Sequence, residues 1–317
     1  MLDEKLRPQG NPCSPRPTRR SPQSRTDSRD LNGPWGDQIS GKKIGFRIGF
    51  QNINGLPIDP RHDIYKTLPE DLAKYEFDIF GAQEINLNLK HLAPSHSWGR
   101  RFQGNKVFNI AASNIHTTSQ ERRLFGGTAL FLQPFSSARS TDHGHDDTGL
   151  GRWSWVSLQG RQGICTRIIT GYRPIKDFSN RPGTVYSQQE KFFHEQGHPR
   201  DPRTAFLEDL GVVIRQWTQD GDQVVLGLDT NEYIFSGDIA RWVNSLGLIP
   251  ALQQLHPQLP EVATCDKGSR QIPIDGIWVT PSLDVIYGGM SGFGDCFTGP
   301  SDHRLLWIEV SNDSILG

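Results

Sequence analysis

Eight short segments with strand character between residues 44 and 310 restrict most strongly the folds open to this chain of 317 residues. Residues 44–53 alternate apolar and polar side chains with a period of two, which is typical of a strand with one buried face. Seven further apolar runs lie between turn-forming residues, at positions 77–82, 127–132, 153–158, 164–170, 224–228, 274–279 and 305–310. Eight strands require at least one large sheet, and we favour two.

Helical periodicity is much rarer than strand periodicity. Apolar residues recur at helical spacing only in residues 63–75, 202–219 and 237–246. Three helices are too few for a regular alternation of strands and helices. The sequence therefore predicts an α+β fold, a four-layered sandwich in which two mainly antiparallel sheets pack together and helices cover their outer faces. We expect residues 175–201 to form a long loop, which a compact domain usually keeps for function.

The first 43 residues differ in composition from the remainder. They contain nine Lys/Arg and five Asp/Glu and are rich in Pro, Ser and Arg. Such a segment buries too little apolar surface to become ordered by itself. We interpret residues 1–43 as a disordered basic leader and residues 44–317 as the folded domain. The leader is interpreted as a linker, with a nucleic-acid-binding arm as the alternative.

The charge of the folded part argues against a basic clamp. Residues 44–317 hold the remaining 25 Lys/Arg and 30 Asp/Glu. This balance counts against tight, sequence-independent nucleic-acid binding by the domain alone, because such binding depends on neutralising phosphates. Carboxylates gathered around a metal ion would bias the same balance.

The sequence contains neither an apolar run of the roughly 20 residues that a membrane span needs nor the apolar core of a signal peptide. We therefore expect an intracellular protein, nuclear or cytoplasmic, that does not bind a membrane. The four cysteines show neither zinc-ligand spacing nor a disulfide framework, so we interpret them as buried or idle thiols. They are Cys13, Cys165, Cys265 and Cys296.

Polar groups at the ends of two apolar runs carry the strongest functional signal. Asp229-Thr230-Asn231 closes the run at 224–228, and Ser301-Asp302-His303 precedes the run at 305–310. A rigid sheet can hold polar side chains at its strand ends against a substrate. An acid, an amide and a His beside its own acid are the parts of a metal-assisted hydrolase.

Other strand ends carry polar residues in an ordered series along the chain. The series comprises Asn52 and Asn54, Gln83-Glu84, Tyr172, Asp229 and Asn231, Asp275, and Asp302-His303. This series resembles that of the endonuclease/exonuclease/phosphatase superfamily, and it is most similar to the apurinic-endonuclease-type endonuclease domains of non-LTR retrotransposons. The resemblance spans about residues 44–310 and implies a deoxyribonuclease-like sandwich.

The resemblance implies a magnesium site, with Mn²⁺ as a substitute ion. Glu84 would be the principal ligand, and Asn52 and Asp302 would complete the protein's contribution. Mg²⁺ prefers carboxylate and water oxygens, which suits this set. Asn54 stands where several relatives carry an acid; it is either a further member of the metal shell or a turn residue before Gly55.

The resemblance also assigns the remaining catalytic roles. Asp229 would position or deprotonate the attacking water, and Asn231 would donate to phosphate oxygens and orient that acid. Tyr172 would approach the scissile phosphate. His303 would donate a charged hydrogen bond to a phosphate oxygen, held in place by Asp275. We expect the neighbouring Glu232 to face solvent.

These assignments imply a Mg²⁺-dependent endonuclease that nicks DNA in the manner of retroelements. Such a domain lies at the start of a longer polyprotein with a downstream reverse transcriptase, and we expect this chain to be that N-terminal domain. The first alternative is hydrolysis of abasic DNA, RNA, or inositol or lipid phosphates, with specificity in residues 133–152 and 175–201. A catalytically idle binding domain is the second alternative.

Overall fold

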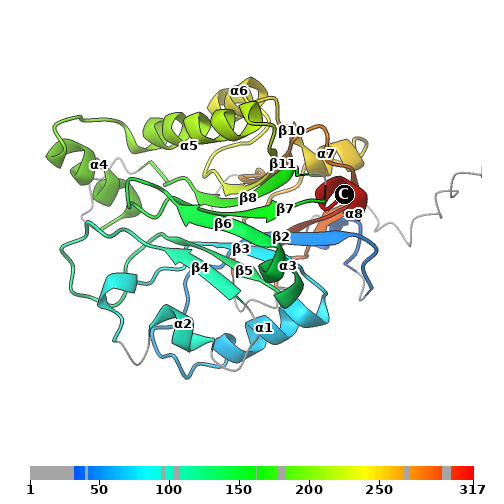
Figure 1. The fold of residues 1–317 in the computed structure, drawn as a ribbon. Helices are drawn as coiled ribbons and strands as arrows, with labels where there is room; N and C mark the ends of the chain where they lie inside the picture. The colour runs from blue at the N-terminus through cyan, green and yellow to red at the C-terminus, as the bar shows by residue number, and fades with distance from the viewer. Residues whose placement is uncertain are drawn as a thin grey trace, which may run out of the picture.

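Two β-sheets pack face to face at the centre of the molecule, and helices lie on the outer face of each sheet (Figure 1). This arrangement is the predicted four-layered sandwich. Residues 1–31, most of the expected leader, lie outside the described residues. The computed structural model describes residues 32–39, 42–93, 97–102, 108–161, 163–176, 183–267, 271–294 and 301–317.

Each sheet is mixed but mainly antiparallel, as predicted. Only the pairs β2–β3 and β8–β9 are parallel among the paired strands of the described residues. In spatial order, the seven-stranded sheet contains β1 (Trp35–Gly36), β12 (Val285–Met290), β13 (Leu306–Val310), β2 (Phe46–Asn52), β3 (Ile79–Gln83), β5 (Thr128–Leu132) and β4 (Phe108–Ala112). The six-stranded sheet contains β10 (Ile249–Pro250), β11 (Asp275–Val279), β9 (Gln223–Asp229), β8 (Cys165–Tyr172), β7 (Trp153–Gln159) and β6 (Ser140–His145).

The three predicted helices are present as α1, α5 and α6. None of the helices in the described part of the chain is long and apolar enough to cross a bilayer. The helical segments are α1 (Ile64–Lys74), η1 (Leu89–His91), α2 (Trp98–Arg101), α3 (Pro134–Arg139), α4 (Val185–Glu195), α5 (Pro202–Gln219), α6 (Gly237–Ser245), α7 (Ala251–Leu255) and α8 (Asn312–Ile315).

Helix α4 corrects the prediction that residues 175–201 form a loop. The Thr184 hydroxyl caps the helix by accepting a hydrogen bond of 3.2 Å from the Ser187 backbone N–H. The helix buries Tyr186 and Phe193 on one face. Its other buried side chain is a glutamine, so the apolar period in the sequence is too weak to predict a helix.

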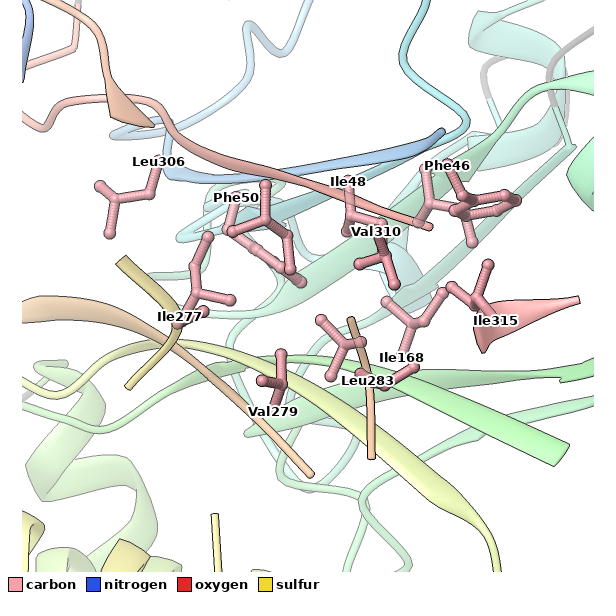
Figure 2. Packing of buried hydrophobic residues seen from close by; sticks show 14 of the residues in the cluster. Phe46, Ile48, Phe50, Ile168, Ile277, Val279, Leu283, Leu306, Val310 and Ile315 are labelled. Atoms are coloured by element: carbon pink, nitrogen blue, oxygen red, sulfur yellow. The ribbon is translucent and has the colours of Figure 1, made fainter. Parts of the chain in front are cut away.

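The central core lies between the two sheets (Figure 2). Alternate residues of β2, namely Phe46, Ile48 and Phe50, face inward. Ile168 of β8 and Val279 of β11 meet them from the other sheet. Each such side chain contributes about 1.5–3 kcal/mol by leaving water, so these contacts fix the packing of one sheet on the other.

The outer faces of both sheets are covered by helices. Leu68 of α1 packs with Phe80 of β3 on one side of the sandwich. Leu210 of α5 and Ile239 of α6 pack with Val224 of β9 on the other side. Because both outer faces are buried in this way, the ends of the strands remain as places for a rigidly held polar site.

The fold begins earlier than the predicted boundary at residue 43. Strand β1 pairs with β12, and Trp35 is buried, with its indole N–H donating to the Pro260 carbonyl at 2.8 Å. Residues 32–39 are therefore part of the packed structure rather than of the leader. A single buried Trp among polar residues produces no period that the sequence could reveal.

Weak apolar patterns explain the other missed elements. Residues 133–152, expected to contain a substrate-specific loop, form α3 and β6 over most of their length. Strand β6 lacks apolar alternation and is held by pairing with β7. Strand β12 contains Gly288 and Gly289, which interrupt a strand pattern.

Candidate active site

Strand register brings five of the predicted positions to one end of the sandwich. In the seven-stranded sheet, Asn52 of β2 lies beside Gln83 of β3, and Glu84 follows directly. In the other sheet, Asp229 of β9 lies between Tyr172 of β8 and Asp275 of β11. The two rows meet across the sandwich, because the side-chain amide Nδ2 of Asn52 donates to Asp229 Oδ2 at 2.8 Å.

His303 joins the same cluster from the segment before β13. Its Nδ1 lies 3.0 Å from Asp275 Oδ2, and its Nε2 lies 4.0 Å from Asp229 Oδ2. The backbone on either side of the ring is also held: the His303 N–H donates to Ser301 Oγ, and its carbonyl accepts from Gln51 Nε2. The imidazole is therefore fixed between two carboxylates.

Three of the predicted residues have left-handed backbone conformations. The φ angles are 51° at Glu84, 50° at Asn231 and 50° at Asn54. Asn tolerates this region, but Glu rarely adopts it, and such strain costs about 1–3 kcal/mol. The strained backbone is therefore at Glu84 itself, the residue predicted to be the principal metal ligand.

Asn54 lies at a turn beside the cluster. Its side chain is exposed, and its backbone N–H donates to Asn52 Oδ1 at 2.9 Å. Gly55 follows with φ of 99°. The sequence predicts two alternative roles for Asn54, a metal-shell residue or a turn residue before Gly55. The local geometry is that of the turn residue.

The two acids around His303 both favour its charged form. Burial raises the pKa of Asp229 to about 8, and the charge of Asp275 adds to this effect. Burial alone would lower the pKa of His303, but the carboxylates of Asp275 and Asp229 raise that pKa well above its usual value. The His303 ring is therefore held as an imidazolium when Asp275 is ionised.

Glu84 and Tyr172 also influence each other's ionisation. Burial raises the pKa of Glu84, and hydrogen bonds with Tyr172 and Asn52 oppose that rise. Burial also raises the pKa of Tyr172 well above its usual value, helped by the negative charges of Glu84 and Asp229. The Tyr172 hydroxyl thus keeps its proton and can donate a hydrogen bond.

The donor set fits a hard divalent cation. Ligand atoms of Asp229, Asp275 and His303 lie within 4.8 Å of one another, and Glu84 is near enough for its charge to raise the pKa of Asp229. Burial raises the pKa of both Glu84 and Asp229, as expected of acids whose charge is poorly compensated. Asp302 adds a fourth carboxylate that raises the pKa of Glu84, although it also pairs with Lys267 Nζ at 2.9 Å. An ion with oxygen ligands would neutralise this excess charge.

Glu232 corrects the prediction that it faces solvent. Its Oε2 accepts hydrogen bonds from Arg173 Nη1 at 2.6 Å and from Arg203 Nη2 at 2.7 Å. Both guanidinium groups are almost fully buried. The Arg173 carbonyl in turn accepts from Asn231 Nδ2, so this ion-pair network adjoins the site.

Several supporting contacts gave no signal in the sequence. The buried Thr264 Oγ1 accepts from the Asp275 N–H at 3.0 Å, and Ser301 Oγ donates to the Asn52 carbonyl at 2.6 Å. Cys265, interpreted as an idle thiol, has its Sγ 4.0 Å from Asp302 Oδ2. These contacts join segments far apart in the chain, so local sequence patterns could not predict them.

A separate cavity of about 500 Å³ lies between residues 114–119 and helix α4. Its lining includes Asn114, His116 and Lys191 but none of the predicted catalytic or metal-binding residues. Part of the segment expected to govern specificity, residues 175–201, therefore lines this cavity.

Comparison with solved structures identifies the fold. It is a deoxyribonuclease-like sandwich, as the sequence predicted. No protein-family model and no curated protein matches the sequence. The three structures described next are 15–17% identical to this chain, so the likeness is one of fold.

Three of these structures illustrate the range of the matches, each over 84% of this chain. The 3′ phosphatase NExo from Neisseria, bound to a product DNA hairpin, matches over 99% of its own chain with a TM-score of 0.58 and 17% identity. The AP endonuclease from Archaeoglobus fulgidus matches over 99% with a TM-score of 0.56 and 15% identity. The human Nocturnin catalytic domain matches over 93% with a TM-score of 0.56 and 16% identity.

Proposed function

We propose that this protein is a divalent-metal-dependent phosphodiesterase that acts on nucleic acid. One observation carries the proposal: His303 is held between Asp275 and Asp229, while Asn52 ties Asp229 to the strand end that bears Glu84. This arrangement supplies an acid, a base and a place for a cation within one cluster. The solved structures of the same fold include a DNA-bound phosphatase and an AP endonuclease, which supports the class of substrate.

Glu84, Asn52 and Asp302 are the residues we assign to the metal ion, and Mg²⁺ is the ion we propose, with Mn²⁺ as a substitute. Carboxylate and amide oxygens are suitable ligands for such hard cations. A bound ion would neutralise the charge that builds on the phosphate during hydrolysis. Asn54 remains a candidate for this shell only through its sequence position.

Asp229 is the residue we assign to the attacking water. Burial raises the pKa of this carboxylate, and a general base is most effective when its pKa lies near the working pH. The hydrogen bonds from Asn52 and from the Asn231 N–H fix the direction in which its oxygens point. The water would therefore be oriented and deprotonated at one defined carboxylate.

His303, Tyr172 and Asn231 are assigned to the phosphate. The His303 imidazolium would donate to a phosphate oxygen where negative charge develops, and Asp275 would keep the ring in that orientation. The protonated Tyr172 hydroxyl is a second donor. The Asn231 amide is anchored by the Arg173 carbonyl and offers its remaining N–H as a third.

Among nucleic-acid substrates we propose duplex DNA, which the enzyme would nick. The order of the strand-end residues supports a retroelement-type endonuclease, and the basic leader is compatible with DNA. In that setting the nick would expose a 3′ hydroxyl for a reverse transcriptase encoded in the same polyprotein. Abasic DNA, RNA, and inositol or lipid phosphates are the alternative substrates.

A substrate panel tests the proposal. The purified protein is incubated with supercoiled plasmid, an abasic oligonucleotide, RNA and inositol phosphates, each with Mg²⁺ and with EDTA. We expect Mg²⁺-dependent conversion of the plasmid to the nicked form. Hydrolysis of an inositol phosphate without cleavage of any nucleic acid would contradict the proposed substrate, and no hydrolysis of any substrate would contradict the enzymatic proposal.

A further inference from the structure

Residues 119–127 lie alongside the segment that follows Glu84. Thr128 of β5 pairs with Gln83 of β3, so the residues before Thr128 reach the same end of the sheet as the catalytic cluster. The backbone N–H of Asn86 donates to the Gly126 carbonyl at 2.9 Å. The backbone N–H of Asn88 donates to the Arg122 carbonyl, also at 2.9 Å. We call residues 119–127 the rim segment.

Two buried asparagines hold the rim segment in place. Asn86 Oδ1 accepts from the Gly126 N–H at 2.7 Å, and Asn88 Nδ2 donates to the carbonyls of Ser119 and Glu121. Leu124 is buried within the segment. The backbone beside Glu84 is therefore a fixed platform, and exposed side chains on it are presented in defined positions.

Arg123 is one of these exposed side chains. It forms no ion pair with any residue in the described ranges. Its Nη2 atom lies only 2.9 Å from the place where a Cβ of Gly55 would be. A side chain at this position would displace the guanidinium, so Gly55 leaves room for it three residues after Asn52. An uncompensated cation therefore stands at the edge of an acidic catalytic cluster.

Phe125 is the second exposed side chain, with 55% of its surface accessible. It lies two residues from Arg123 on the same platform, just before Gly126 (φ 92°) and Gly127 (φ 84°). A large exposed aromatic ring costs free energy in water. Next to a phosphate-directed arginine, such a ring is suited to stack on a nucleobase.

We propose that Arg123 and Phe125 form a strand-binding subsite for the nucleotide next to the scissile phosphate. Arg123 binds the phosphate of that nucleotide through its planar guanidinium, and Phe125 stacks on its base. The subsite rests on the proposed function, which it deepens by requiring that the base beside the cleaved bond leave the stack of the duplex to reach the ring. It is sequence-tolerant, because every base presents a face to the ring.

Matched variants test the subsite. Phe135 is 52% exposed and follows the opposite end of β5, where Arg139 lies over its ring at 5.0 Å. Arg123→Gln and Phe125→Ala are compared with Arg139→Gln and Phe135→Ala. The measurements are fluorescence-anisotropy binding of an oligonucleotide at several salt concentrations, KM and kcat for its cleavage, and turnover of a small phosphodiester, bis-p-nitrophenyl phosphate. Thermal melting checks that the exposed substitutions leave the fold intact.

We expect Arg123→Gln and Phe125→Ala each to weaken oligonucleotide binding and raise KM by about tenfold, within the range of a lost stacking or phosphate contact. Arg123→Gln should also reduce the slope of log affinity against log salt concentration by roughly one, the value for one lost phosphate contact. Turnover of the small phosphodiester should be the same in the two test variants as in the wild type. The two control variants should bind and cleave the oligonucleotide as the wild type does. Equal effects in test and control variants, or an unchanged salt slope in Arg123→Gln, would overturn the subsite while leaving the phosphodiesterase in place.

The binding measurement separates this subsite from the proposed function. If the wild-type protein binds the oligonucleotide in an Arg123-dependent manner but hydrolyses nothing, the proposed function fails and the subsite stands. If the wild-type protein does not bind the oligonucleotide, the subsite is wrong whichever phosphoester is hydrolysed.

Discussion

His303 is the residue on which the proposed chemistry most depends, because its ring contacts acids from two strands of the same sheet. Asp275 on β11 lies at Nδ1, and Asp229 on β9 lies near Nε2. Both acids are buried, and Asp229 also accepts hydrogen bonds from Asn52 and from the Asn231 N–H. Burying several ionisable groups together lowers the stability of the fold. The presence of this buried group is therefore best explained by a role in the proposed hydrolysis.

His303→Ala and Asp229→Asn should each lower the rate of DNA cleavage at saturating substrate by at least about a hundredfold. Asp275→Asn should have a milder effect, because it only releases the ring. His256→Ala is the matched control, since its Nε2 lies 3.4 Å from Asp37 in a His–Asp pair away from the site. A rate for His303→Ala equal to that of His256→Ala would contradict the assignment.

At the scale of elements, Glu232 connects the site to helix α5. It binds Arg173, which follows β8, and Arg203, which lies in the first turn of α5. Glu232→Gln would leave two buried guanidinium groups without their shared carboxylate. We expect it to lower the free energy of unfolding by about 1.5–3 kcal/mol, the range for hydrogen bonds to charged groups.

Urea unfolding of Glu232→Gln and of Glu208→Gln provides the comparison. Glu208 lies on α5 and forms an ion pair with Arg200, but 60% of the Glu208 side chain is exposed. Loss of this ion pair should lower the free energy of unfolding by no more than about 1 kcal/mol. The cleavage rate of Glu232→Gln should also fall, because the Arg173 carbonyl anchors Asn231. Equal stability of the two variants would show that the network contributes nothing beyond a surface pair.

The elements that the sequence predicted are those with a strong apolar period. Strand β2 and helix α5 fill the core, so their patterns are visible in the chain. Edge strand β6 and helix α4 bury few apolar residues and were missed. The sequence predicts polar residues at the strand ends, and their roles stay predictions. The left-handed backbone at Glu84 and the partners of Glu232 depend on packing between distant segments, which no local pattern encodes.

At the scale of the whole molecule, the proposed division is between a folded catalytic part and a basic leader. Residues 1–31 contain seven Lys/Arg and four Asp/Glu. Their deletion should weaken DNA binding and flatten its salt dependence, because fewer phosphates are neutralised. Cleavage at saturating DNA should change little, since no catalytic candidate precedes Asn52. Unchanged affinity and salt slope would identify the leader as a linker.

The end point of this deletion matters. A deletion of residues 1–40 would also remove β1 and the buried Trp35, whose loss should cost about 3–5 kcal/mol of stability. Thermal melting of the two truncated proteins separates the electrostatic effect from the loss of packing.

The most direct test of the central claim is the rate of Mg²⁺-dependent plasmid nicking by the wild type, Glu84→Ala and Glu76→Ala. The two glutamates flank β3 at opposite ends and share the left-handed conformation, with φ of 51° and 52°. Losing the principal metal ligand should slow nicking by about a thousandfold in Glu84→Ala. Glu76→Ala should nick at close to the wild-type rate, and EDTA should stop the reaction. Near-wild-type nicking by Glu84→Ala, or nicking that persists in EDTA, would contradict the account.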